Sequence, residues 1–302
     1  MKDVIIIGGG PASMSAGVYA ARRKLETMVI AKEFGGQVAN TDKVENYLGF
    51  KSISGPELAD KFEEHLKDYD VETEEGHAVN NVKQKGSKVE VELENGDKYE
   101  AKTAIVAAGG RRRQLNVPGE EKLKNKGVSY CAICDGPLFQ DEKIAIVGGG
   151  YSGTESALYM SKIAEKVFLI NIGESLVGEP ITIEKVNEND NIEVLNNAQT
   201  TEILGDSMVE GLKYKDTESN EKKELDVAGV FIEIGTIPNS DIVDVDTDED
   251  GYIIVDDDMR TSKERIFAAG DITSKGIKQI AVSIGQGCTA ALEVDSFLSS
   301  RE

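Results

Sequence analysis

An internal repeat places the strongest constraint on the fold of this chain. Residues 3–10 (DVIIIGGG) recur in similar form as residues 143–150 (KIAIVGGG). A short, continuous apolar run is typical of a strand buried on both faces of a parallel sheet. Each copy leads into a helical pattern, over residues 13–23 and 153–163. The repeat therefore predicts an α/β fold with two Rossmann-like, three-layer domains.

The small residues after each apolar run have the spacing of a dinucleotide-binding turn. The first glycine permits a tight turn, the second lets backbone N–H groups approach a pyrophosphate, and the third position requires a small side chain for helix packing. The residues at these positions are Gly8, Gly10 and Ser13 in the first copy and Gly148, Gly150 and Gly153 in the second. Each following helix N-terminus adds partial positive charge for phosphates. Two glycine turns without ligands are the alternative.

The two copies differ where an acidic residue would bind ribose hydroxyls. After the apolar residues 27–31, the first copy offers Glu33, which suits an adenosine ribose. After residues 167–170, the second copy offers Asn171, Ile172 and Gly173, with Glu174 beyond them. The second site is therefore predicted to be chemically different.

Further strands fit parallel sheets with a smaller antiparallel layer. Residues 88–93 alternate between polar and apolar, and Asn95-Gly96 then marks a hairpin turn. Residues 104–110 and 229–235 are apolar runs that end in small residues, which predicts one buried strand in each domain.

Cys131 and Cys134 form a Cys-x-x-Cys motif, and the chain has one further cysteine, Cys288. In a reducing compartment this spacing indicates a redox pair or half of a zinc site. A zinc site needs four ligands, and the remaining candidates, Cys288, His65 and His77, are not paired at ligand spacing, so we expect no metal. Cys288 is predicted to be a buried, inert thiol near the start of an apolar helix.

Composition and charge narrow the range of partners. The net charge of −21 argues against nucleic acid and anionic membranes, because phosphate binding needs clustered Lys and Arg. The dense acidic residues of 241–258 are expected to form a solvated face. No apolar run is long enough for a membrane span, and residues 1–3 lead directly into a strand without a signal sequence. These features predict a cytoplasmic protein.

Beyond the repeat, the order of motifs resembles that of low-molecular-weight thioredoxin reductases over nearly the whole chain. The resemblance implies FAD and a redox motif at Cys131-Ala132-Ile133-Cys134-Asp135-Gly136. It places FAD contacts on the first turn, on residues 34–37 and 44–47, on the strand end at 108–109, on the late motif at 266–271 and on residues 278–280. The FAD-binding residues so implied are Gly8, Gly10, Pro11, Ala12, Ser13, Glu33, Gly35, Gly36, Gln37, Asn46, Ala108, Gly109, Gly270, Asp271, Lys278, Gln279 and Ile280.

The resemblance also implies how the domains and the reaction are organised. The FAD-binding domain would comprise residues 1–113 and 242–302, with a pyridine-nucleotide-type domain, residues 114–241, inserted into it. Cys134 would face the flavin, Cys131 would attack the disulfide of thioredoxin or a thioredoxin-like protein, and Asp135 would transfer protons. The family forms homodimers.

One departure from the family pattern concerns the electron donor. Family members that use NADPH carry an arginine cluster after the second strand of the inserted domain, and residues 171–177 (NIGESLV) contain none. Arginine pairs well with a 2′-phosphate because its guanidinium is planar and permanently charged. We therefore expect NADH, ferredoxin or a reduced deazaflavin in preference to NADPH. The second nucleotide site would use Gly148, Gly150, Tyr151, Ser152 and Gly153.

Two alternatives stay open from the sequence. A flavin-binding redox sensor that does not turn over would share the fold, although the intact Cys131/Cys134 pair argues against it. The basic run Arg111-Arg112-Arg113 is interpreted either as a solvated hinge or as a docking site for an acidic partner.

Overall fold

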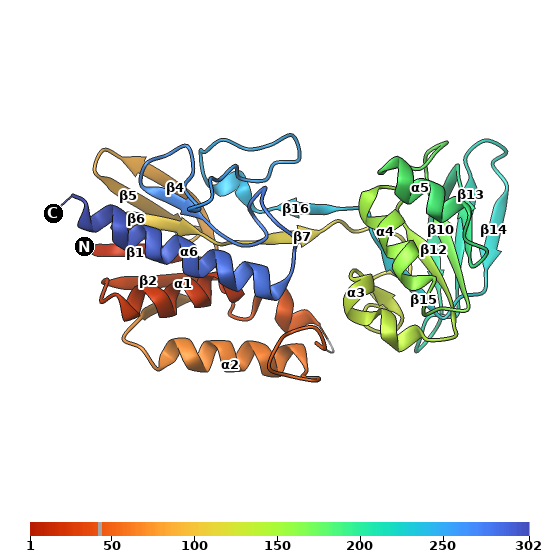
Figure 1. Cartoon of the computed structure of the whole chain (residues 1–302), viewed down its shortest axis with the longest axis horizontal. Helices are drawn as coiled ribbons and strands as arrows, with labels where there is room; N and C mark the ends of the chain where they lie inside the picture. The colour runs from red at the N-terminus through yellow and green to blue at the C-terminus, as the bar shows by residue number, and fades with distance from the viewer. Residues whose placement is uncertain (42–43, 302) are drawn as a thin grey trace. The chain divides into compact units, whose positions relative to one another are not determined.

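Both copies of the repeated apolar run form central strands of parallel sheets. The first is β1 (Lys2–Ile7) and the second is β9 (Lys143–Val147). The computed structural model describes residues 1–41 and 44–301. The chain divides into unit 1, Met1–Arg111 with Ile237–Glu302, and unit 2, Arg112–Thr236 (Figure 1).

The sheet of unit 1 has β1 at its centre. Strand β1 is parallel to β2 (Thr27–Ala31) on one side and to β6 (Lys98–Val106) on the other. The strand order is β3-β2-β1-β6-β5-β4, and β17 also pairs with β6. The other strands are β3 (Glu72–Glu75), β4 (Val79–Lys85), β5 (Lys88–Leu93) and β17 (Ile266–Ala268). The turn predicted at Asn95-Gly96 joins β5 to β6, and Gly96 adopts a φ of +91° there.

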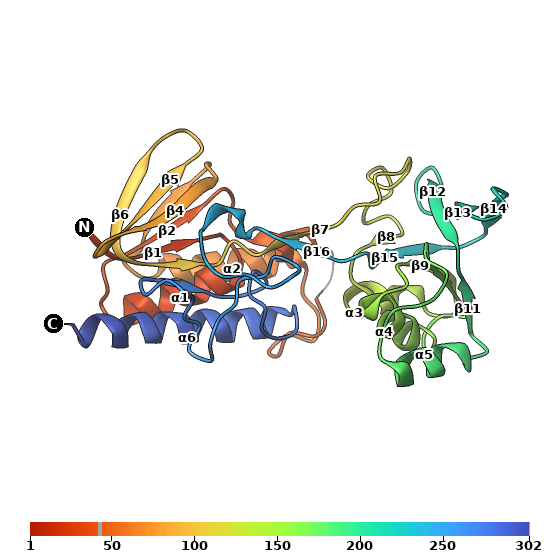
Figure 2. The ribbon, with the colours of Figure 1, turned by 90° about the horizontal axis from the view of Figure 1, so that it is seen from above.

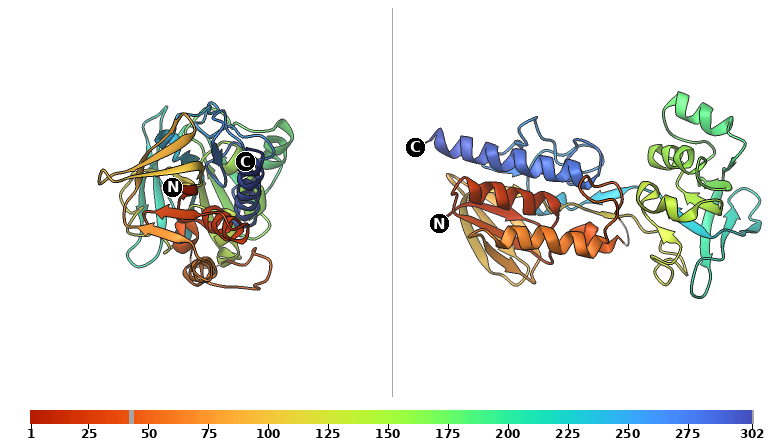
Figure 3. Two further views of the ribbon diagram at one scale, coloured as in Figure 1. Left: turned by 90° about the vertical axis from the view of Figure 1, so that its left-hand side faces the viewer. Right: turned by 60° about the horizontal axis from the view of Figure 1, so that its bottom comes forward.

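Three helices accompany this sheet: α1 (Pro11–Arg22), α2 (Gly55–Lys67) and α6 (Ile280–Ser299). The helices α1 and α6 lie side by side along one face of the sheet, and β4 and β5 extend from its other side (Figures 2 and 3). Two short 3₁₀ turns are η1 (Gly36–Asn40) and η3 (Ser240–Ile242). The core is one cluster of buried residues shared by β1, β2, β6, β17, α1 and α6.

Unit 2 repeats the arrangement on a smaller scale. Its five strands are parallel in the order β11-β10-β9-β15-β8, and β12, β13 and β14 form a separate antiparallel sheet. The strands besides β9 are β8 (Val128–Ser129), β10 (Lys166–Ile170), β11 (Ile192–Leu195), β12 (Ala198–Leu204), β13 (Gly211–Asp216), β14 (Lys222–Leu225) and β15 (Gly229–Ile232). The helical segments are α3 (Ala132–Asp135), η2 (Gly136–Phe139), α4 (Tyr151–Met160) and α5 (Pro180–Asn187).

The alternation of side chains along β9 explains why this sheet is covered on both faces. Ile144 and Ile146 belong to the cluster that includes Ala157 and Met160 of α4. Ala145 and Val147 point the other way and pack in the cluster formed with β12 and β13. A strand buried on both faces requires a continuous apolar run, which is the pattern that the sequence shows. The α/β, three-layer prediction is confirmed.

The helices begin earlier than the residue pattern suggests. Helix α1 starts at Pro11 rather than Ser13, and α4 starts at Tyr151 rather than Gly153. Gly10 and Gly150 are extended caps, and proline suits the first helical position because its missing N–H is not needed there.

The prediction for Cys288 was wrong in two respects. The thiol lies well inside α6 and is half-buried rather than buried near a helix start. Gly287, directly before it, lies inside the same helix and serves helix packing, because a Cβ there would lie 2.0 Å from the carbonyl oxygen of Ala12.

The two segments that cross between the units pair with each other. They are β7 (Gly110–Arg112) and β16 (Thr236–Pro238), which form a two-stranded sheet. The structure divides the units at these strands, whereas the sequence placed the domain limits slightly later, after residues 113 and 241.

Candidate active site

The turn after β1 has the backbone that a pyrophosphate cradle requires. Gly8 has a φ of +125°, and a Cβ at this position would lie 2.3 Å from the carbonyl oxygen of Ala107. Gly10 is the N-cap of α1 and no side chain caps it, so the first amides of the helix, including that of Ala12, are available. A Cβ on Gly10 would meet no atom within 4 Å, which leaves open space beside these amides. Ser13 is buried, and its hydroxyl donates to the Gly10 carbonyl at 2.9 Å.

The late motif, at Gly270 and Asp271, packs against the first turn of α1. Gly270 has a φ of +82°, and a Cβ on it would lie 2.9 Å from the Cβ of Ala12. The Gly270 amide donates to Gln286 Oε1 at 2.8 Å, and Ser283 donates to Asp271 Oδ1 at 3.0 Å. Asp271 is thus held beside the N-terminus of α1 by side chains of α6.

The segment after β2 folds back over the glycine turn. A Cβ on Gly9 would lie 2.0 Å from the carbonyl oxygen of Glu33, and the Gly35 amide donates to the Gly9 carbonyl at 2.8 Å. Gly36, at a φ of +57°, approaches the Cα of Gly10. Glu33 itself is exposed at this strand end, where a ribose could reach it.

The remaining residues expected near the flavin make contacts within unit 1. The side-chain Nε2 of Gln37 donates to the Gly110 carbonyl, and Asn46 Nδ2 donates to Gln279 Oε1 at 3.2 Å. Lys278 Nζ donates to the Thr273 carbonyl at 2.6 Å. Ile280 packs against the cluster formed by Val38, Val44, Ile53, Leu58 and Ala59.

Lys278 is a partly buried cation. Its Nζ lies 4.2 Å from the centroid of the Tyr252 ring. Burial lowers the pKa of Lys278, while the charges of Asp271 and Asp248 act in the opposite direction. The ammonium group is therefore fixed by Thr273 and Tyr252 as well as by nearby carboxylates.

Asn239 is a supporting residue that the sequence did not single out. Its Nδ2 donates to the Ala108 carbonyl at 2.8 Å, and its backbone amide donates to the Gly109 carbonyl at 3.0 Å. Gly109 has a φ of +61°, and a Cβ on it would meet no neighbouring atom within 4 Å. Asn239 thereby fixes the small-residue strand end that was expected to contact the flavin.

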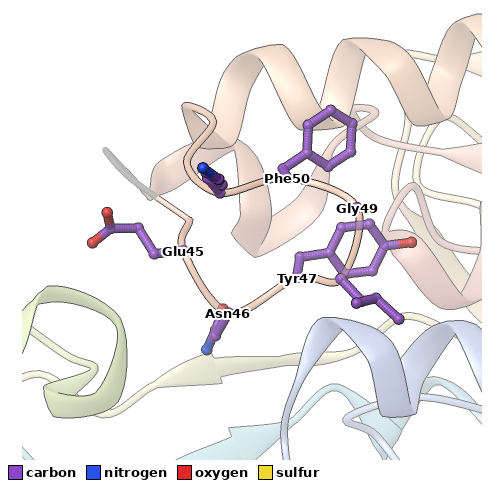
Figure 4. A pocket seen from close by; sticks show the side chains of 7 residues that line it. Glu45, Asn46, Tyr47, Gly49 and Phe50 are labelled. Atoms are coloured by element: carbon purple, nitrogen blue, oxygen red, sulfur yellow. The ribbon is translucent and has the colours of Figure 1, made fainter.

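A hollow of about 470 Å³ lies along the loop of residues 45–51 in unit 1 (Figure 4). Its lining includes Asn46, Tyr47, Leu48 and Phe50, and Leu48 is 97% exposed. Tyr47 packs edge-on against Phe62 of α2, which anchors the middle of the loop.

Taken together, the residues of unit 1 fit an FAD molecule. The uncapped amides of α1, the open space at Gly10 and the exposed carboxylate of Glu33 suit a pyrophosphate and an adenosine ribose. Asp271 provides an acceptor for sugar hydroxyls beside them. The roles of these individual residues stay predictions.

In unit 2, Cys131 and Cys134 form a disulfide, with their Cα atoms 5.3 Å apart. Cys131 is the N-cap of α3, and its Sγ accepts a hydrogen bond from the Cys134 amide at 3.3 Å. Both cysteines are half-buried, while Ile133 between them is 49% exposed. The pair is therefore within reach of solvent.

Asp135 is tied to the cysteine pair through Ser129. The Ser129 hydroxyl lies 2.6 Å from Asp135 Oδ2 and 3.1 Å from the amide nitrogen of Cys131, which donates to it. Ser129 ends β8, so the parallel sheet positions this hydroxyl. The sequence predicted Asp135 as a catalytic residue but gave no sign of Ser129.

Glu233 is the most notable residue that sequence reasoning missed. It follows β15, is half-buried, and its Oε1 accepts from the Ala132 amide and from the Ser156 hydroxyl, both at 3.3 Å. Burial raises the pKa of Glu233, and the charge of Arg112 opposes this shift. A charged residue inside the apolar run 229–235 is the signal that could have identified it.

The buried carboxylate of Glu120 organises the segment that precedes the motif. It accepts hydrogen bonds from the Leu115, Asn116 and Val117 amides and from the Tyr130 hydroxyl, the last at 2.8 Å. Burial first, and then the Glu120 carboxylate, raise the pKa of Tyr130 well above its ordinary value.

The second glycine turn has the geometry of the first. Gly148 has a φ of +135°, and a Cβ on Gly153 would lie 1.7 Å from the Gly148 carbonyl oxygen. No atom lies within 4 Å of the Cβ position of Gly150, and no side chain caps α4. Tyr151, 58% exposed, and the exposed Ser152 follow directly. The turn fits a diphosphate.

The loop after β10, where a ribose-binding acidic residue would be expected, has Asn171 at that position. Asn171 is buried, and its Nδ2 donates to the Gly173 carbonyl at 3.1 Å and to Asn196 Oδ1 at 2.8 Å. Its side chain also lies against Gly149, whose Cβ would approach within 2.3 Å. Glu174 is exposed. Asn171 thus stabilises the loop rather than presenting an acceptor.

The arginine run lies on the paired crossover strands. Arg111 Nη1 donates to Asn239 Oδ1 at 3.0 Å, and Arg112 Nη1 donates to Thr236 Oγ1 at 3.3 Å. Two of the three arginines thus link β7 to residues on or next to β16, a role that neither sequence interpretation included. Docking of a partner by this run stays a prediction.

Residues 1–41 and 44–301 contain neither a helix suited to a membrane nor a cluster suited to a metal ion. No helix there has both the length and the apolar character to span a bilayer. No group of three or more His, Cys, Asp or Glu side chains there is arranged to bind a metal ion.

These features define the class of the protein: a flavin-dependent oxidoreductase with a disulfide, built from two nucleotide-binding-type units. The chain belongs to the pyridine nucleotide-disulphide oxidoreductase family, whose model matches residues 2–287. Membership of this family implies a flavin and a pyridine nucleotide. The family and the fold that the sequence predicted are confirmed.

Among solved structures, thioredoxin reductase from Streptococcus pyogenes MGAS5005 superposes with a TM-score of 0.91 at 38% identity, covering 99% of each chain. A ferredoxin-flavin thioredoxin reductase from Clostridium acetobutylicum has a TM-score of 0.55 at 32% identity, with 99% of this chain and 98% of that chain covered. An NADH dehydrogenase of Bacillus subtilis (strain 168) is 42% identical over 98% of this chain and 58% of its own length. This chain spans 57–59% of the length of such curated relatives.

Proposed function

We propose that this chain is an FAD-dependent thioredoxin-disulfide reductase. The observation that carries the proposal is the Cys131–Cys134 disulfide, which belongs to the unit with the second nucleotide turn in a chain whose other unit has the residues of an FAD cradle. The similarity to thioredoxin reductases over both units supports it.

In the proposed reaction, FAD held in unit 1 would, once reduced by the electron donor, supply the two electrons that reduce the Cys131–Cys134 disulfide. The Cys131 thiolate attacks one sulfur of the substrate disulfide, and a mixed disulfide forms as the other substrate sulfur leaves as a thiolate. Asp135 gives that thiolate a proton. Cys134 then attacks Cys131 Sγ, which restores the Cys131–Cys134 disulfide and releases the second substrate sulfur. Asp135 takes up the proton that Cys134 loses.

We propose thioredoxin or a thioredoxin-like protein as the substrate, because a half-buried disulfide beside an exposed Ile133 suits a protein disulfide brought to a surface. The test is a single-turnover trap. Cys134→Ser should leave Cys131 able to attack thioredoxin, so that a stable mixed disulfide accumulates. Cys131→Ser should bind FAD normally and lose thioredoxin reduction, and Cys288→Ser is the matched control that should keep it. Full activity in Cys131→Ser would refute the proposal.

The proposed electron donor is NADH, ferredoxin or a reduced deazaflavin in preference to NADPH. The loop after β10 carries Ile172, Gly173 and Val177 where a 2′-phosphate would need guanidinium groups. The name of the B. subtilis relative favours NADH, and that of the C. acetobutylicum structure favours ferredoxin. The test mixes oxidised enzyme anaerobically with each of the four donors and follows bleaching of the flavin. Rapid bleaching by NADPH at low concentration would overturn this preference.

Two finer properties are also proposed. We expect a homodimer, because the low-molecular-weight thioredoxin reductases that the chain resembles are dimeric. We expect it in the cytoplasm, because a redox-active thiol pair functions in a reducing compartment. Light scattering during size-exclusion chromatography should give twice the chain mass. A flavin-binding sensor would instead accept electrons without multiple turnovers, so continuous reduction of thioredoxin distinguishes the enzyme from the sensor.

A further inference from the structure

Glu233 is a carboxyl group placed directly against the redox motif, and the reaction steps above do not use it. It follows β15, and its backbone amide donates to the Val147 carbonyl at 2.8 Å. That bond fixes its backbone at the end of the central strands. From there its Oε1 reaches the Ala132 amide, which lies between the two cysteines in sequence.

The same oxygen has a second partner on another element. Ser156 of α4 is buried, and its hydroxyl donates to Glu233 Oε1 at 3.3 Å. The carboxyl group therefore joins α4, β15 and the start of α3. A polar link between three packed elements limits how far the backbone of the cysteine motif can move.

We infer that Glu233 is a positioning residue for the thiol pair: it holds the Ala132 amide in place and controls how much thiolate the reduced pair contains. This inference rests on the proposed function, because it concerns the thiol pair as a nucleophile. It assigns a role to a residue outside the Cys-x-x-Cys-Asp motif.

The physical argument concerns charge at short range. The carboxylate is hydrogen-bonded to the amide of the residue that follows Cys131. When ionised, a carboxylate near a thiol disfavours the thiolate, since like charges in a partly desolvated site repel. A neutral carboxyl group exerts no such repulsion. Burial raises the pKa of Glu233, which brings its own ionisation closer to the range in which thiols react.

Other charged groups act on the same site. The charged or titratable residues on the elements around Glu233 are Arg111 and Arg112 on β7, Asp135 on α3, Lys143 at the start of β9, Tyr151, Glu155 and Tyr159 on α4, and the two cysteines. Of these, Arg112 opposes the pKa shift of Glu233. Glu155 and Lys143 are exposed, so solvent screens them.

The test is the pH dependence of thiol alkylation. The reduced holoenzyme is treated with iodoacetamide between pH 5 and 9, and peptide mass spectrometry measures the rate at each cysteine. Each thiolate attacks the reagent carbon and displaces iodide, so the rate reports the thiolate fraction. Glu233→Gln should lower the midpoint for Cys131 or Cys134 by about one pH unit, which is about tenfold more thiolate below the midpoint.

Two controls and a second variant make the outcome decisive. Cys288 is an internal reference in unit 1 whose alkylation should not change. Glu174→Gln removes an exposed carboxylate from the same unit and should leave all rates unchanged. Ser156→Ala removes one donor to the carboxylate, so Glu233 should ionise at higher pH and the midpoint should shift in the same direction by less.

Superimposable curves for Glu233→Gln and the unchanged protein would overturn the inference. Equal shifts in Glu233→Gln and Glu174→Gln would also overturn it, because net charge would then explain the effect. The alkylation curves need no thioredoxin and no electron donor. An enzyme that reduced no thioredoxin could therefore still show the Glu233 effect, and the two failures are distinguishable.

Discussion

The hydroxyl of Ser129 bridges the Asp135 carboxylate and the Cys131 amide, at 2.6 and 3.1 Å. Asp135 is thereby fixed relative to the first cysteine by a residue on a different element. The proton transfer that we propose for Asp135 would depend on that fixed position.

Asp135→Asn should slow the reoxidation of the reduced thiol pair by thioredoxin by about a hundredfold, because amide groups do not transfer protons in this range. Ser129→Ala should cause a smaller loss, about tenfold, since Asp135 remains but is less well positioned. Stopped-flow kinetics at constant FAD content would measure both. The exposed Asp190 offers a control, and an unchanged rate in Asp135→Asn would contradict the role.

Gly287 and Gly285 on α6 provide a matched pair for the packing of α1 against α6. A Cβ at Gly287 would lie 2.0 Å from the Ala12 carbonyl oxygen, whereas a Cβ at Gly285 would meet nothing within 4 Å. Gly287→Ala should destabilise unit 1 by about 1–3 kcal/mol through overpacking. Gly285→Ala should be neutral or stabilise by about 0.5–1 kcal/mol. Thermal unfolding measures both, and equal midpoints would argue against tight packing here.

Gly10 distinguishes cofactor binding from folding. Its backbone is extended and its Cβ position is open, so alanine is tolerated by the apoprotein. We expect Gly10→Ala to leave the unfolding of the apoprotein unchanged and to weaken FAD binding at least tenfold, because the methyl group enters the space beside the α1 amides.

Gly150→Ala is the equivalent change in unit 2. It should not alter FAD content, and it should weaken NADH binding if that nucleotide uses the second turn. Titration of apoprotein with FAD, followed by flavin fluorescence, measures the first effect. Normal FAD affinity in Gly10→Ala would contradict the proposed cradle.

Glu120 should be more important for stability than its neighbour Glu121. Glu120 is 3% exposed and accepts from three backbone amides and the Tyr130 hydroxyl, whereas Glu121 is exposed. Glu120→Gln places an NH₂ group against N–H donors and should cost about 2–4 kcal/mol. Glu121→Gln should change stability by less than about 0.5 kcal/mol. Urea unfolding of the two variants decides between these expectations.

The environment of Asp3 should make the folding stability of the protein depend on pH. Burial alone would raise its pKa, but the Lys102 ammonium at 2.7 Å and the Glu26 amide at 2.9 Å outweigh this and hold the pKa below its usual value. A lowered folded-state pKa contributes stability above the unfolded value of 3.8, and that contribution is lost as the pH falls through the folded-state pKa.

Asp3→Asn should therefore be less stable than the unchanged protein by about 1 kcal/mol at pH 7, and the difference should vanish at the acid end of the range. Denaturant midpoints between pH 2 and 7 would show this. A constant difference across the whole range would mean that ionisation of Asp3 is not its source.

The sequence was sufficient for the layers and the turns because these depend on local patterns. The apolar run of β1 and the positive φ of Gly8 follow from residues adjacent in the chain. The helix starts were placed two residues late, because the extended conformation of Gly10 is a property of the turn rather than of composition.

The supporting residues could not be predicted in the same way. Asn239 and Glu233 form hydrogen bonds with residues remote in sequence, and Ser129 bonds to Asp135 on a different element. The charge inside the apolar run 229–235 marks Glu233 as unusual, but the sequence does not show which partners the fold brings to these three residues. Cys288 was placed near a helix start, whereas α6 begins at Ile280 and continues through Gly287, because tertiary packing against Ala12 requires a small residue inside the helix.

The pairing of β7 with β16 has a consequence for how this chain folds. Arg112 and Thr236, the first and last residues of unit 2, are joined by a hydrogen bond, so the two ends of this inserted unit lie close together once it is folded. Closing a disordered loop of that length would cost roughly 4 kcal/mol of chain entropy. If unit 2 folds first, its two ends are already close together, and the strands of unit 1 before and after the insert are joined by a short connection. The sheet of unit 1 can then form almost as if its sequence were continuous.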